Sequence, residues 1–528
     1  MAETIRLNVA VPWSLTHYIP LNGFHPLYRC LFDERPGGVA IHAWDAVGLS
    51  QSLRDDAGFR GQILHAASAA NQEMAQHSGT ATARGYYGRF GCHNMALSRI
   101  LPGHIEVHHT AAFPTLTRPF VLHVEAFAPI LSPFVHSGSG AMQDQNALRE
   151  HYRGILAHPL CLGVFSHIPN TLRDVSRFFS SPDIDEKLFS SRIGLSSMSL
   201  PRDLPGTIGA VSTPRFLFIN SAHQNPANFF NRGGHVVLRF WRALLSSGRA
   251  GTLVMRCTRP DDSLLRARGV DVEFLRAEEG RSIVWVQNYL ASQELNALMA
   301  NAHFFLLPSM SLHSASIMQA MALGAVPVVT DTIGTSVYVD DGQNGIVLEG
   351  VMKENWHQDP STGVMMDHFH WSENVEASLI AQLMAKTVAL LNAPERYAEM
   401  REAALARSRT RFSGKAFSKE FWSSVERLME KHAAQVANDL AGSLPSSRGI
   451  PIERCLLRET DWSRVFESPP QPLFWARTGL GWVSELGGAF IHAQGDVPKE
   501  IHDWSPLAEY CFPGAPKLTF APTVASGA

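Results

Sequence analysis

Apolar and polar positions alternate along this chain in a pattern that is clearest in its second half. The apolar run Phe304–Leu307 stops at Pro308, and a Ser-rich loop then leads into apolar residues that recur at helical spacing. Gly324 ends this helix, and a second β-branched run follows at 326–329. The pattern predicts a strand, a helix and a second strand, and such a unit normally places its two strands parallel.

The same alternation of apolar runs and amphipathic stretches predicts an α/β fold for most of the chain. Strands are predicted, in chain order, at residues 5–11, 37–44, 118–130, 215–220, 251–260 and 282–290, with a strand followed by a helix at 158–179. Helices are predicted at residues 26–32, 234–245, 293–301 and 375–435. Strands that alternate with helices in this way indicate parallel sheets covered by helices.

The length of 528 residues exceeds the usual size of a single core and favours two domains. A Ser-, Pro- and Gly-rich stretch at 196–214 reads as the linker between them. We therefore expect an N-terminal domain over residues 1–205 and a second domain over 206–440. Residues 441–528 carry tryptophans among glycine turns and predict a small C-terminal β-rich extension.

Composition excludes several classes of protein. A hydrophobic fraction of 45% and a charged fraction of 18% are typical of a globular protein, and a net charge of −3 predicts no general attraction to nucleic acid. The six cysteines form no C-x2-C pair, which argues against a zinc site and a disulfide framework. With no basic leader and no apolar stretch of membrane-spanning length, we expect a cytoplasmic protein that can contact the inner face of a membrane without crossing it.

The loop and helix at 308–331 point to a ligand site. In open parallel sheets, ligands bind beyond the carboxyl ends of the strands, where a helix N-terminus offers amide groups to an anion. The loop at 309–316 occupies that position. Most positive residues of the chain are arginines, whose planar fork suits a phosphate, so a phosphate site is expected to use Arg.

The sequence PSMSLHSASIMQAMALGAVPVVTD at 308–331, followed by DDGQNGIVL at 340–348, resembles the donor-binding half of the group 1 glycosyltransferases. The resemblance implies a GT-B architecture, in which two Rossmann-like domains face a cleft. It also implies a strand within 184–195 and a terminal helix that returns to the first domain. The implied reaction moves a sugar from a nucleotide-diphosphate donor to an acceptor hydroxyl, with retention of configuration and without a required metal or other cofactor.

The family's two motif glutamates fall on Ser311 and Gln319 of this chain, and neither residue is acidic. Gln319 can inherit part of the ribose contact, because an amide offers an acceptor and two donors. Ser311 is short and uncharged, which weakens the implied contact to the donor sugar. The resemblance further implies that His313, Ser314 and Ser316 line the donor loop.

The basic residues that hold the donor diphosphate are also implied by the resemblance. Arg232 and Gly233 stand where the family has Lys-Gly, and Gly234 opens the following helix, so Arg232 is the leading phosphate ligand. Arg256 and Arg259 follow the next strand, where they either add positive charge at the pyrophosphate or face solvent.

The acceptor side is implied to lie in the first domain. The family has a histidine near the reaction centre in the stretch that corresponds to the strand at 118–130, and this chain has His123 and Glu125 there. Either side chain can act as a general base or orient the acceptor hydroxyl, while a core histidine is the alternative reading for His123. Polar residues of the first loop can either contact a glycan, lipid-linked or other hydroxylated acceptor or be ordinary turn residues, namely Thr16, His17, Asn22 and His25.

A second reading belongs to another class of protein. Because both motif glutamates are replaced, the chain can also be a nucleotide-sugar-binding or glycan-binding protein that kept the fold and lost catalysis. A pyridoxal-phosphate phosphorylase of the same fold is disfavoured, since the only lysines before residue 386 are Lys187 and Lys353, and neither lies in a Gly-rich segment.

Overall fold

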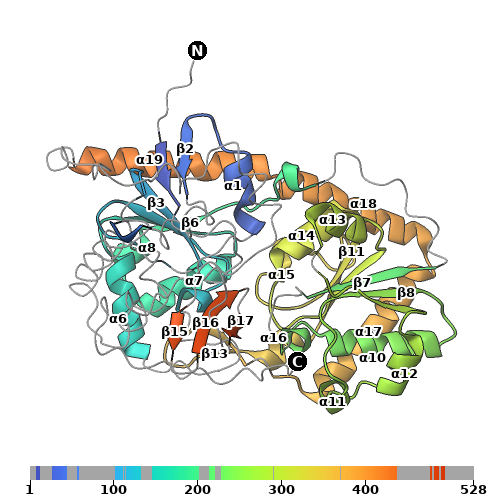
Figure 1. The fold of residues 1–528 in the computed structure, drawn as a ribbon. Coiled ribbons are helices and arrows are strands. Elements are labelled where there is room, and N and C mark those ends of the chain that lie inside the picture. The colour runs from blue at the N-terminus through green and yellow to red at the C-terminus, as the bar shows by residue number, and fades with distance from the viewer. Residues whose placement is uncertain are drawn as a thin grey trace. The chain divides into compact units, whose positions relative to one another are not determined.

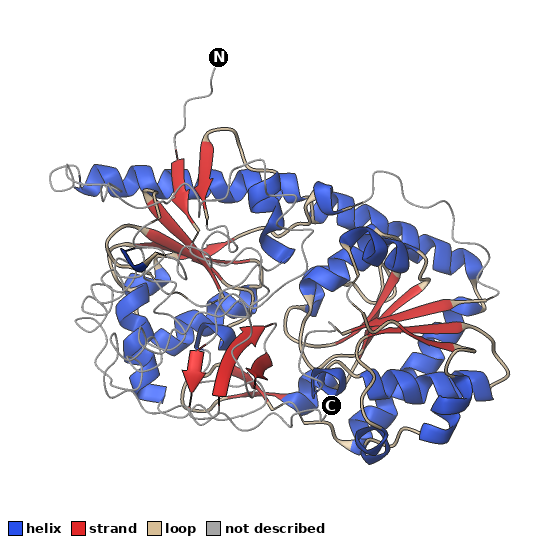
Figure 2. Cartoon of the chain, viewed as in Figure 1, coloured by secondary structure: helices blue, strands red, loops and turns tan. Residues whose placement is uncertain are grey.

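The computed structural model describes residues 7–11, 26–43, 56–58, 101–110, 112, 114–131, 145–200, 213–220, 227–288, 290–368, 370–436, 476–478, 481–486 and 489–493. The described strands form two six-stranded parallel sheets, a two-stranded hairpin and a three-stranded antiparallel sheet, with helices packed on the parallel sheets (Figures 1 and 2). The predicted α/β fold with two Rossmann-like sheets is therefore confirmed. The chain divides into two compact units, one reaching Arg192 and resuming at Ser418, the other spanning Ile193–Phe417.

The first unit contains a parallel sheet whose order reverses next to its first strand. In spatial order the strands are β2 (Val39–His42), β1 (Leu7–Ala10), β3 (Ile105–His109), β4 (Phe120–His123), β5 (Cys161–Ser166) and β6 (Leu188–Ser190). The chain places β2 on one side of β1 and then adds β3, β4, β5 and β6 in order on the other side of β1. This reversal creates a switch point between β1 and β3, where a doubly wound sheet binds its ligand.

Short helices and one long helix pack against the first sheet. They are η1 (Pro26–Tyr28), α1 (Arg29–Asp33), η3 (Ala128–Leu131), α6 (Gln145–Leu156), α7 (Pro169–Phe179), α8 (Pro182–Asp185) and, from Ser418 on, α19 (Gly414–Val436). Pro169 starts α7 because its missing N–H has no intrahelical partner at that position, and Ser180 ends the helix in a left-handed conformation. The buried indole of Trp422 on α19 donates to the carbonyl of Leu31 at 3.0 Å.

The second unit holds the other parallel sheet. In spatial order its strands are β12 (Ile346–Leu348), β11 (Val326–Thr330), β10 (Phe304–Leu307), β7 (Arg215–Ile219), β8 (Thr252–Arg256) and β9 (Ile283–Trp285). Every residue of β10 and β11 is buried, which is typical of parallel strands covered by helices on both faces. The chain builds β7, β8 and β9 toward one edge and β10, β11 and β12 toward the other, so the switch point lies between β7 and β10.

Helices cover both faces of the second sheet. They are η4 (Ser197–Ser199), α9 (Ala227–Asn231), α10 (Gly234–Ser246), α11 (Asp262–Ala267), α12 (Val272–Glu278), α13 (Ser292–Ala300), α14 (Ser314–Ala322), α15 (Thr335–Tyr338), α16 (Val351–Asn355), α17 (Glu373–Leu391) and α18 (Pro394–Arg411). Figure 1 shows α13, α14 and α18 on one face and α10, α12 and α17 on the other. No helix among the described residues is long and apolar enough to span a bilayer.

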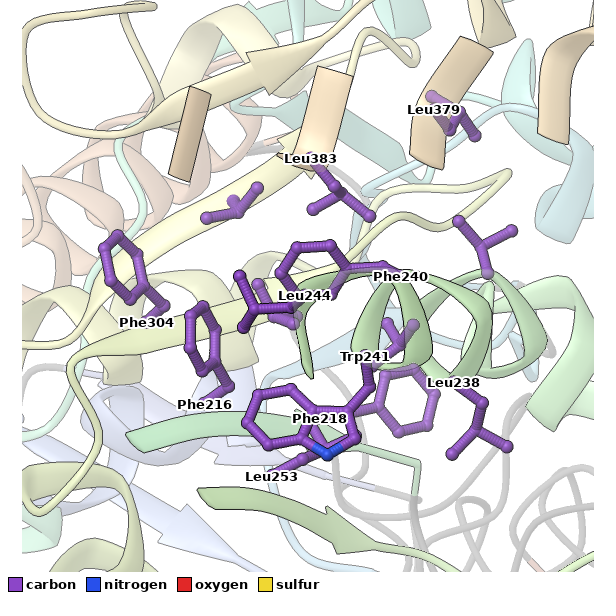
Figure 3. Close-up of a cluster of buried hydrophobic side chains, with 14 of the residues drawn as sticks. Phe216, Phe218, Leu238, Phe240, Trp241, Leu244, Leu253, Phe304, Leu379 and Leu383 are labelled. Atoms are coloured by element: carbon purple, nitrogen blue, oxygen red, sulfur yellow. The ribbon is translucent and has the colours of Figure 1, made fainter. Parts of the chain in front are cut away.

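An aromatic core joins the second sheet to α10 and α17 (Figure 3). Phe216 and Phe304 come from the paired strands β7 and β10, and their rings stack with centroids 5.0 Å apart. Trp241 of α10 is fully buried, and its indole donates to Ser282 Oγ at 3.1 Å. Truncating such a buried aromatic costs about 3–5 kcal/mol, so this core fixes the position of α10 on the sheet.

Two smaller antiparallel elements complete the described fold. The hairpin pairs β13 (Trp356–Gln358) with β14 (Met365–Asp367), and the meander contains β15 (Ala476–Thr478), β16 (Gly481–Leu486) and β17 (Ala489–Ala493). The meander agrees with the β-rich character predicted for the C-terminal extension. Residues 182–185 form a helix, and the strand implied within 184–195 is confined to β6.

Candidate functional site

The candidate site of the second unit lies at the switch point of its sheet. The segment after β7 contributes Arg232, Gly233 and the start of α10, while the segment after the neighbouring strand β10 runs through 308–313 to the start of α14. The carboxyl ends of parallel strands share one edge of a sheet, so both segments lie at the same edge.

Gly233 brings these two segments into contact. Its φ of +76° lies in the left-handed region, and a Cβ at this position would lie 2.1 Å from the carbonyl oxygen of Pro308. Beside it, the N–H of Met310 donates to the carbonyl of Asn231 at 2.9 Å. The turn that contains Arg232 and the loop before Ser311 are therefore in direct backbone contact.

The start of α10 can bind an anion. Gly233 is its N-cap residue and has no side chain to satisfy the first N–H groups of the helix, which begins at Gly234. The helix has 13 residues, so its N-terminus carries the partial positive charge of a full helix dipole.

Two arginines place positive charge at this edge of the sheet. Arg232 is 8% exposed, and its Nη1 lies 3.5 Å from the carbonyl oxygen of Ile219 at the end of β7. Arg256 is 6% exposed and is the last residue of β8, where it pairs with Ile219. Burial raises the pKa of the Cys257 thiol, while the charges of Arg256 and Arg232 act in the opposite direction. Both guanidinium groups are thus close to one thiol.

Arg259 does not extend this positive cluster. Its Nε and Nη2 bond Glu279 Oε1 and Asp262 Oδ1, the second at 2.7 Å. The charge of Arg259 is thus neutralised by two carboxylates of its own surroundings.

The sequence did not single out Asn220, which belongs to the same edge. Asn220 follows β7, is 3% exposed, and its N–H donates to the carbonyl of Arg256 at 3.0 Å. Its side-chain oxygen has no hydrogen-bond partner within the described ranges. A polar residue directly after the central strand was the signal that could have identified it.

The loop at 308–313 is organised by His313. Its Nε2 lies 3.1 Å from Ser309 Oγ and 3.5 Å from Ser311 Oγ, so the three side chains form one cluster. The loop ends at His313, and Ser314 is the buried first residue of α14. Ser311 and His313 thus belong to one cluster with Ser309, and Ser316 is half-buried on the first turn of the helix. The part that these residues play in binding a ligand stays a prediction.

Gln319 lies one turn further along α14, and its amide group is already engaged. Gln319 Nε2 donates to Asn296 Oδ1 at 2.7 Å, and Asn296 Nδ2 donates to the carbonyl of Ser199 at 2.7 Å. This bond uses one donor of the amide and leaves the role of acceptor to Oε1.

His123 of the first unit is the last residue of β4 and is 1% exposed. Its Nδ1 lies 3.0 Å from the hydroxyl of Tyr28, and its Nε2 lies 3.0 Å from Ser191 Oγ. Burial, and then the charge of Glu125, raise the pKa of the Tyr28 phenol well above its usual range, so this hydroxyl stays protonated. Both ring nitrogens of His123 have hydrogen-bond partners within the unit.

Further residues, which the sequence did not single out, surround His123. His109 ends the paired strand β3, and the ring of His167 stacks on His123 with centroids 5.6 Å apart.

Glu125 lies two residues beyond β4, is half-buried, and its backbone carbonyl accepts from Thr171 Oγ1 at 2.7 Å. The first-loop candidates lie outside the described residues, namely Thr16, His17, Asn22 and His25.

Residues 237–358 match the family of glycosyl transferases group 1. The matched segment lies within the second unit and covers less than half of the chain. The segment contains the loop at 308–313, α14 and Gln319, while Arg232 and Gly233 lie just before it. Among the described residues, no group of three or more His, Cys, Asp or Glu side chains is arranged to hold a metal ion.

Solved structures with similar folds are distant from this chain. HepE (Alr3699) of Anabaena, solved with UDP and glucose, is 14% identical at a TM-score of 0.45, covering 80% of this chain and 100% of its own. Sucrose-phosphate synthase of Thermosynechococcus elongatus is 13% identical at 0.43, covering 66% and 77%. TarM is 12% identical at 0.41, covering 61% of this chain and 54% of its own, so the match spans about half of TarM.

No curated protein matches the sequence. The likenesses to solved structures are too distant to assign a function to the chain. Any assignment therefore rests on the residues of the switch point and on the family match.

Proposed function

We propose that the chain is a glycosyltransferase that moves a sugar from a nucleotide-diphosphate donor to an acceptor hydroxyl, with retention of configuration. In this proposal the second unit binds the donor, and the first unit binds a glycan, a lipid-linked sugar or another hydroxylated acceptor. The proposal needs no cofactor beyond the donor, which is a co-substrate.

The observation that carries the proposal is the positive charge at the switch point of the second sheet. Arg256 ends β8, and Nη1 of Arg232 lies 3.5 Å from the carbonyl oxygen of Ile219 at the end of the neighbouring strand β7. Arg232 also stands directly before the start of α10, which has no side-chain cap. A diphosphate carries two or more negative charges, and its charge grows at the leaving oxygen as the bond to the sugar breaks. Guanidinium groups and helix amides that are already in place stabilise that charge in the transition state, so this site supplies the chemistry without requiring a metal ion.

On the donor side, the proposed contacts follow from position. Arg232, Arg256 and the amides of Gly233 and Gly234 would hold the diphosphate. Ser311, His313, Ser314 and Ser316 would line the sugar and phosphate end of the loop, and the Gln319 oxygen would accept from a ribose hydroxyl. The Gln319 amide is held by Asn296, which would present that oxygen in one orientation.

On the acceptor side, the proposed residues are Glu125 and His123. Glu125 is half-buried just past the carboxyl end of β4, where a carboxylate can accept a hydrogen bond from a sugar hydroxyl. His123 is held on both nitrogens by Tyr28 and Ser191, so its proposed part is to order this edge of the first sheet.

A screen of UDP-, GDP- and ADP-sugars for release of the nucleoside diphosphate tests this function. A transferase hydrolyses its own donor slowly when no acceptor is present, so one nucleotide series should give enzyme-dependent release. The matched control is Arg249→Ala, because Arg249 precedes β8 and lies at the opposite end of this strand from Arg256. Release should be lost in Arg232→Ala and kept in Arg249→Ala.

A second candidate function is a nucleotide-sugar-binding or glycan-binding protein without turnover. The non-acidic Ser311 and the amide of Gln319, engaged by Asn296, favour this candidate, since both replace carboxylates of the family motif. It predicts nucleotide binding that weakens in Arg232→Ala, together with no donor hydrolysis and no transfer. Turnover with any donor and acceptor pair would exclude it.

A further inference from the structure

A hairpin insertion in the second unit reaches both loops of the candidate site. Strands β13 and β14 lie between α16 and α17, and tryptophans stand at the two ends of this insertion. Trp356 Nε1 donates to the carbonyl of Met310 at 3.2 Å, and Trp371 Nε1 donates to the carbonyl of Phe230 at 2.9 Å. Met310 belongs to the loop after β10, and Phe230 belongs to the segment after β7.

The contact at Met310 fixes the first of these loops. The Met310 carbonyl accepts from Thr332 Oγ1 at 3.1 Å as well as from Trp356, so both of its lone pairs are used. The Met310 N–H donates to Asn231. The peptide groups on either side of Met310 are therefore held in one orientation, directly before Ser311 and His313.

The contact at Phe230 fixes the second loop in the same manner. The Phe230 carbonyl accepts from the N–H of Gly233 at 2.8 Å and also from Trp371. This carbonyl thereby anchors the tight turn that contains Arg232. Trp371 also packs edge-on against His235 in the first turn of α10, with centroids 5.2 Å apart.

Asn355 joins the two tryptophans at the base of the hairpin. This residue is 2% exposed, and its backbone carbonyl accepts from the N–H of His368 at 3.0 Å. Its side-chain oxygen accepts from the N–H of His370, also at 3.0 Å. Trp356 follows Asn355 directly and Trp371 follows His370, so these bonds set the two indoles on a common base.

We propose that Trp356 and Trp371 are positioning residues, which set the separation between the Arg232 turn and the Ser311 loop and so determine how tightly the site binds a diphosphate. The proposal rests on the proposed function, because it assumes that these two loops hold the same anion. Neither indole is required to touch the ligand. Each acts through a backbone carbonyl, so the loss of an indole N–H should lower affinity even where the fold is kept.

Titration calorimetry on Trp356→Phe and Trp371→Phe tests the proposal, with UDP, GDP, ADP and inorganic pyrophosphate as probes. Phenylalanine keeps an aromatic ring in place and removes the N–H donor. We expect each variant to bind the best nucleotide about fivefold more weakly, the equivalent of one ordinary hydrogen bond. The loss should be the same for pyrophosphate, since the loops are proposed to hold the phosphates.

The matched control is Trp422→Phe, which removes an indole bond to the backbone carbonyl of Leu31 in the first unit without touching either loop. It should lower the melting temperature and leave the dissociation constant unchanged. Melting curves of all variants show which of them fold. If Trp371→Phe does not fold, the affinity of Trp356→Phe alone tests the positioning role, because Trp356 is only half-buried. Unchanged affinity in folded Trp356→Phe and Trp371→Phe would overturn the positioning role, whereas a wild type that binds no probe would overturn the proposed function as well.

Discussion

Gly233 determines how closely the two loops of the candidate site approach each other. Its backbone adopts a left-handed φ, which any side chain disfavours, and the carbonyl of Pro308 fills the place of a Cβ. Gly248, at the other end of α10, has a similar φ of +80° and nothing within 4 Å of a Cβ. A side chain at either position would be strained by the same left-handed backbone conformation. The two positions differ in the space that surrounds a Cβ.

The variants Gly233→Ala and Gly248→Ala should therefore differ in stability. Gly248→Ala should cost about 1 kcal/mol through the left-handed backbone alone. Gly233→Ala should cost about 1–3 kcal/mol more, because its new methyl group displaces the loop at Pro308. Urea unfolding of the two variants and the wild type measures both values, and equal losses would show that the loops are not in contact at Gly233.

The residues of the site could be predicted from the sequence to different degrees. The sequence placed Arg232 and Ser311 in loops that follow apolar strands, because a glycine-bounded turn and a strand end fix the backbone locally. Their part in binding a ligand was implied by the resemblance and stays a prediction. The fate of Arg259 did not follow, since Glu279, its ion-pair partner, is distant in sequence. The same holds for Gln319, whose amide bonds Asn296 on another helix.

At the scale of elements, β3 shows what the apolar pattern misses. Its sequence is IEVHH and all five residues are buried, although three of them are polar. Glu106 is accommodated because His108 Nε2 lies at 2.9 Å and Arg118 Nε at 3.0 Å, and Thr115 donates from its backbone and hydroxyl. These partners satisfy a carboxylate that would otherwise be costly to bury.

This network predicts that acid destabilises the first unit. Burial by itself raises the pKa of Glu106, but the hydrogen bond from His108 and the charge of Arg118 outweigh burial. Together they lower the pKa from 4.5 to about 2. Because the folded pKa is the lower one, the stabilisation is present above pH 4.5 and is lost as the pH falls toward 2. The shift corresponds to about 3 kcal/mol at neutral pH.

Urea unfolding between pH 6 and pH 3 measures this effect. The wild type should lose stability steeply as the pH falls, while Glu106→Gln should start less stable and lose less over the same range. Equal slopes for the two proteins would contradict the assignment of the acid sensitivity to Glu106.

Elements with a clear pattern could be predicted, and those defined by tertiary contacts could not. The strands β10 and β11 are continuous apolar runs with clear ends at Pro308 and Gly324. The strand β3 has no such pattern, because three of its five residues are polar. Arg118 and Thr115, which make the burial of Glu106 possible, approach the strand only in the folded unit. The β13–β14 hairpin was also missed, since its two strands are three residues each and are held by Asn355.

At the scale of the molecule, each of the two units carries a switch point in its parallel sheet. The second unit places buried arginines there, and the first unit places a hydrogen-bonded histidine and a half-buried glutamate near the equivalent edge. The net charge of −3 hides this local arrangement, because the charges of the other residues nearly cancel. The central claim is that the switch point of the second unit binds a diphosphate.

Calorimetric titration of UDP, GDP and ADP into the wild type, Arg232→Ala and Arg249→Ala tests this claim most directly. Arg232 makes charged contacts in the proposed complex, so its loss should weaken the best nucleotide about 10- to 100-fold. Arg249→Ala should bind like the wild type, since Arg249 precedes β8 and lies at the opposite end of this strand from Arg256. Equal affinity in Arg232→Ala and the wild type, or no binding of any nucleotide, would contradict the account.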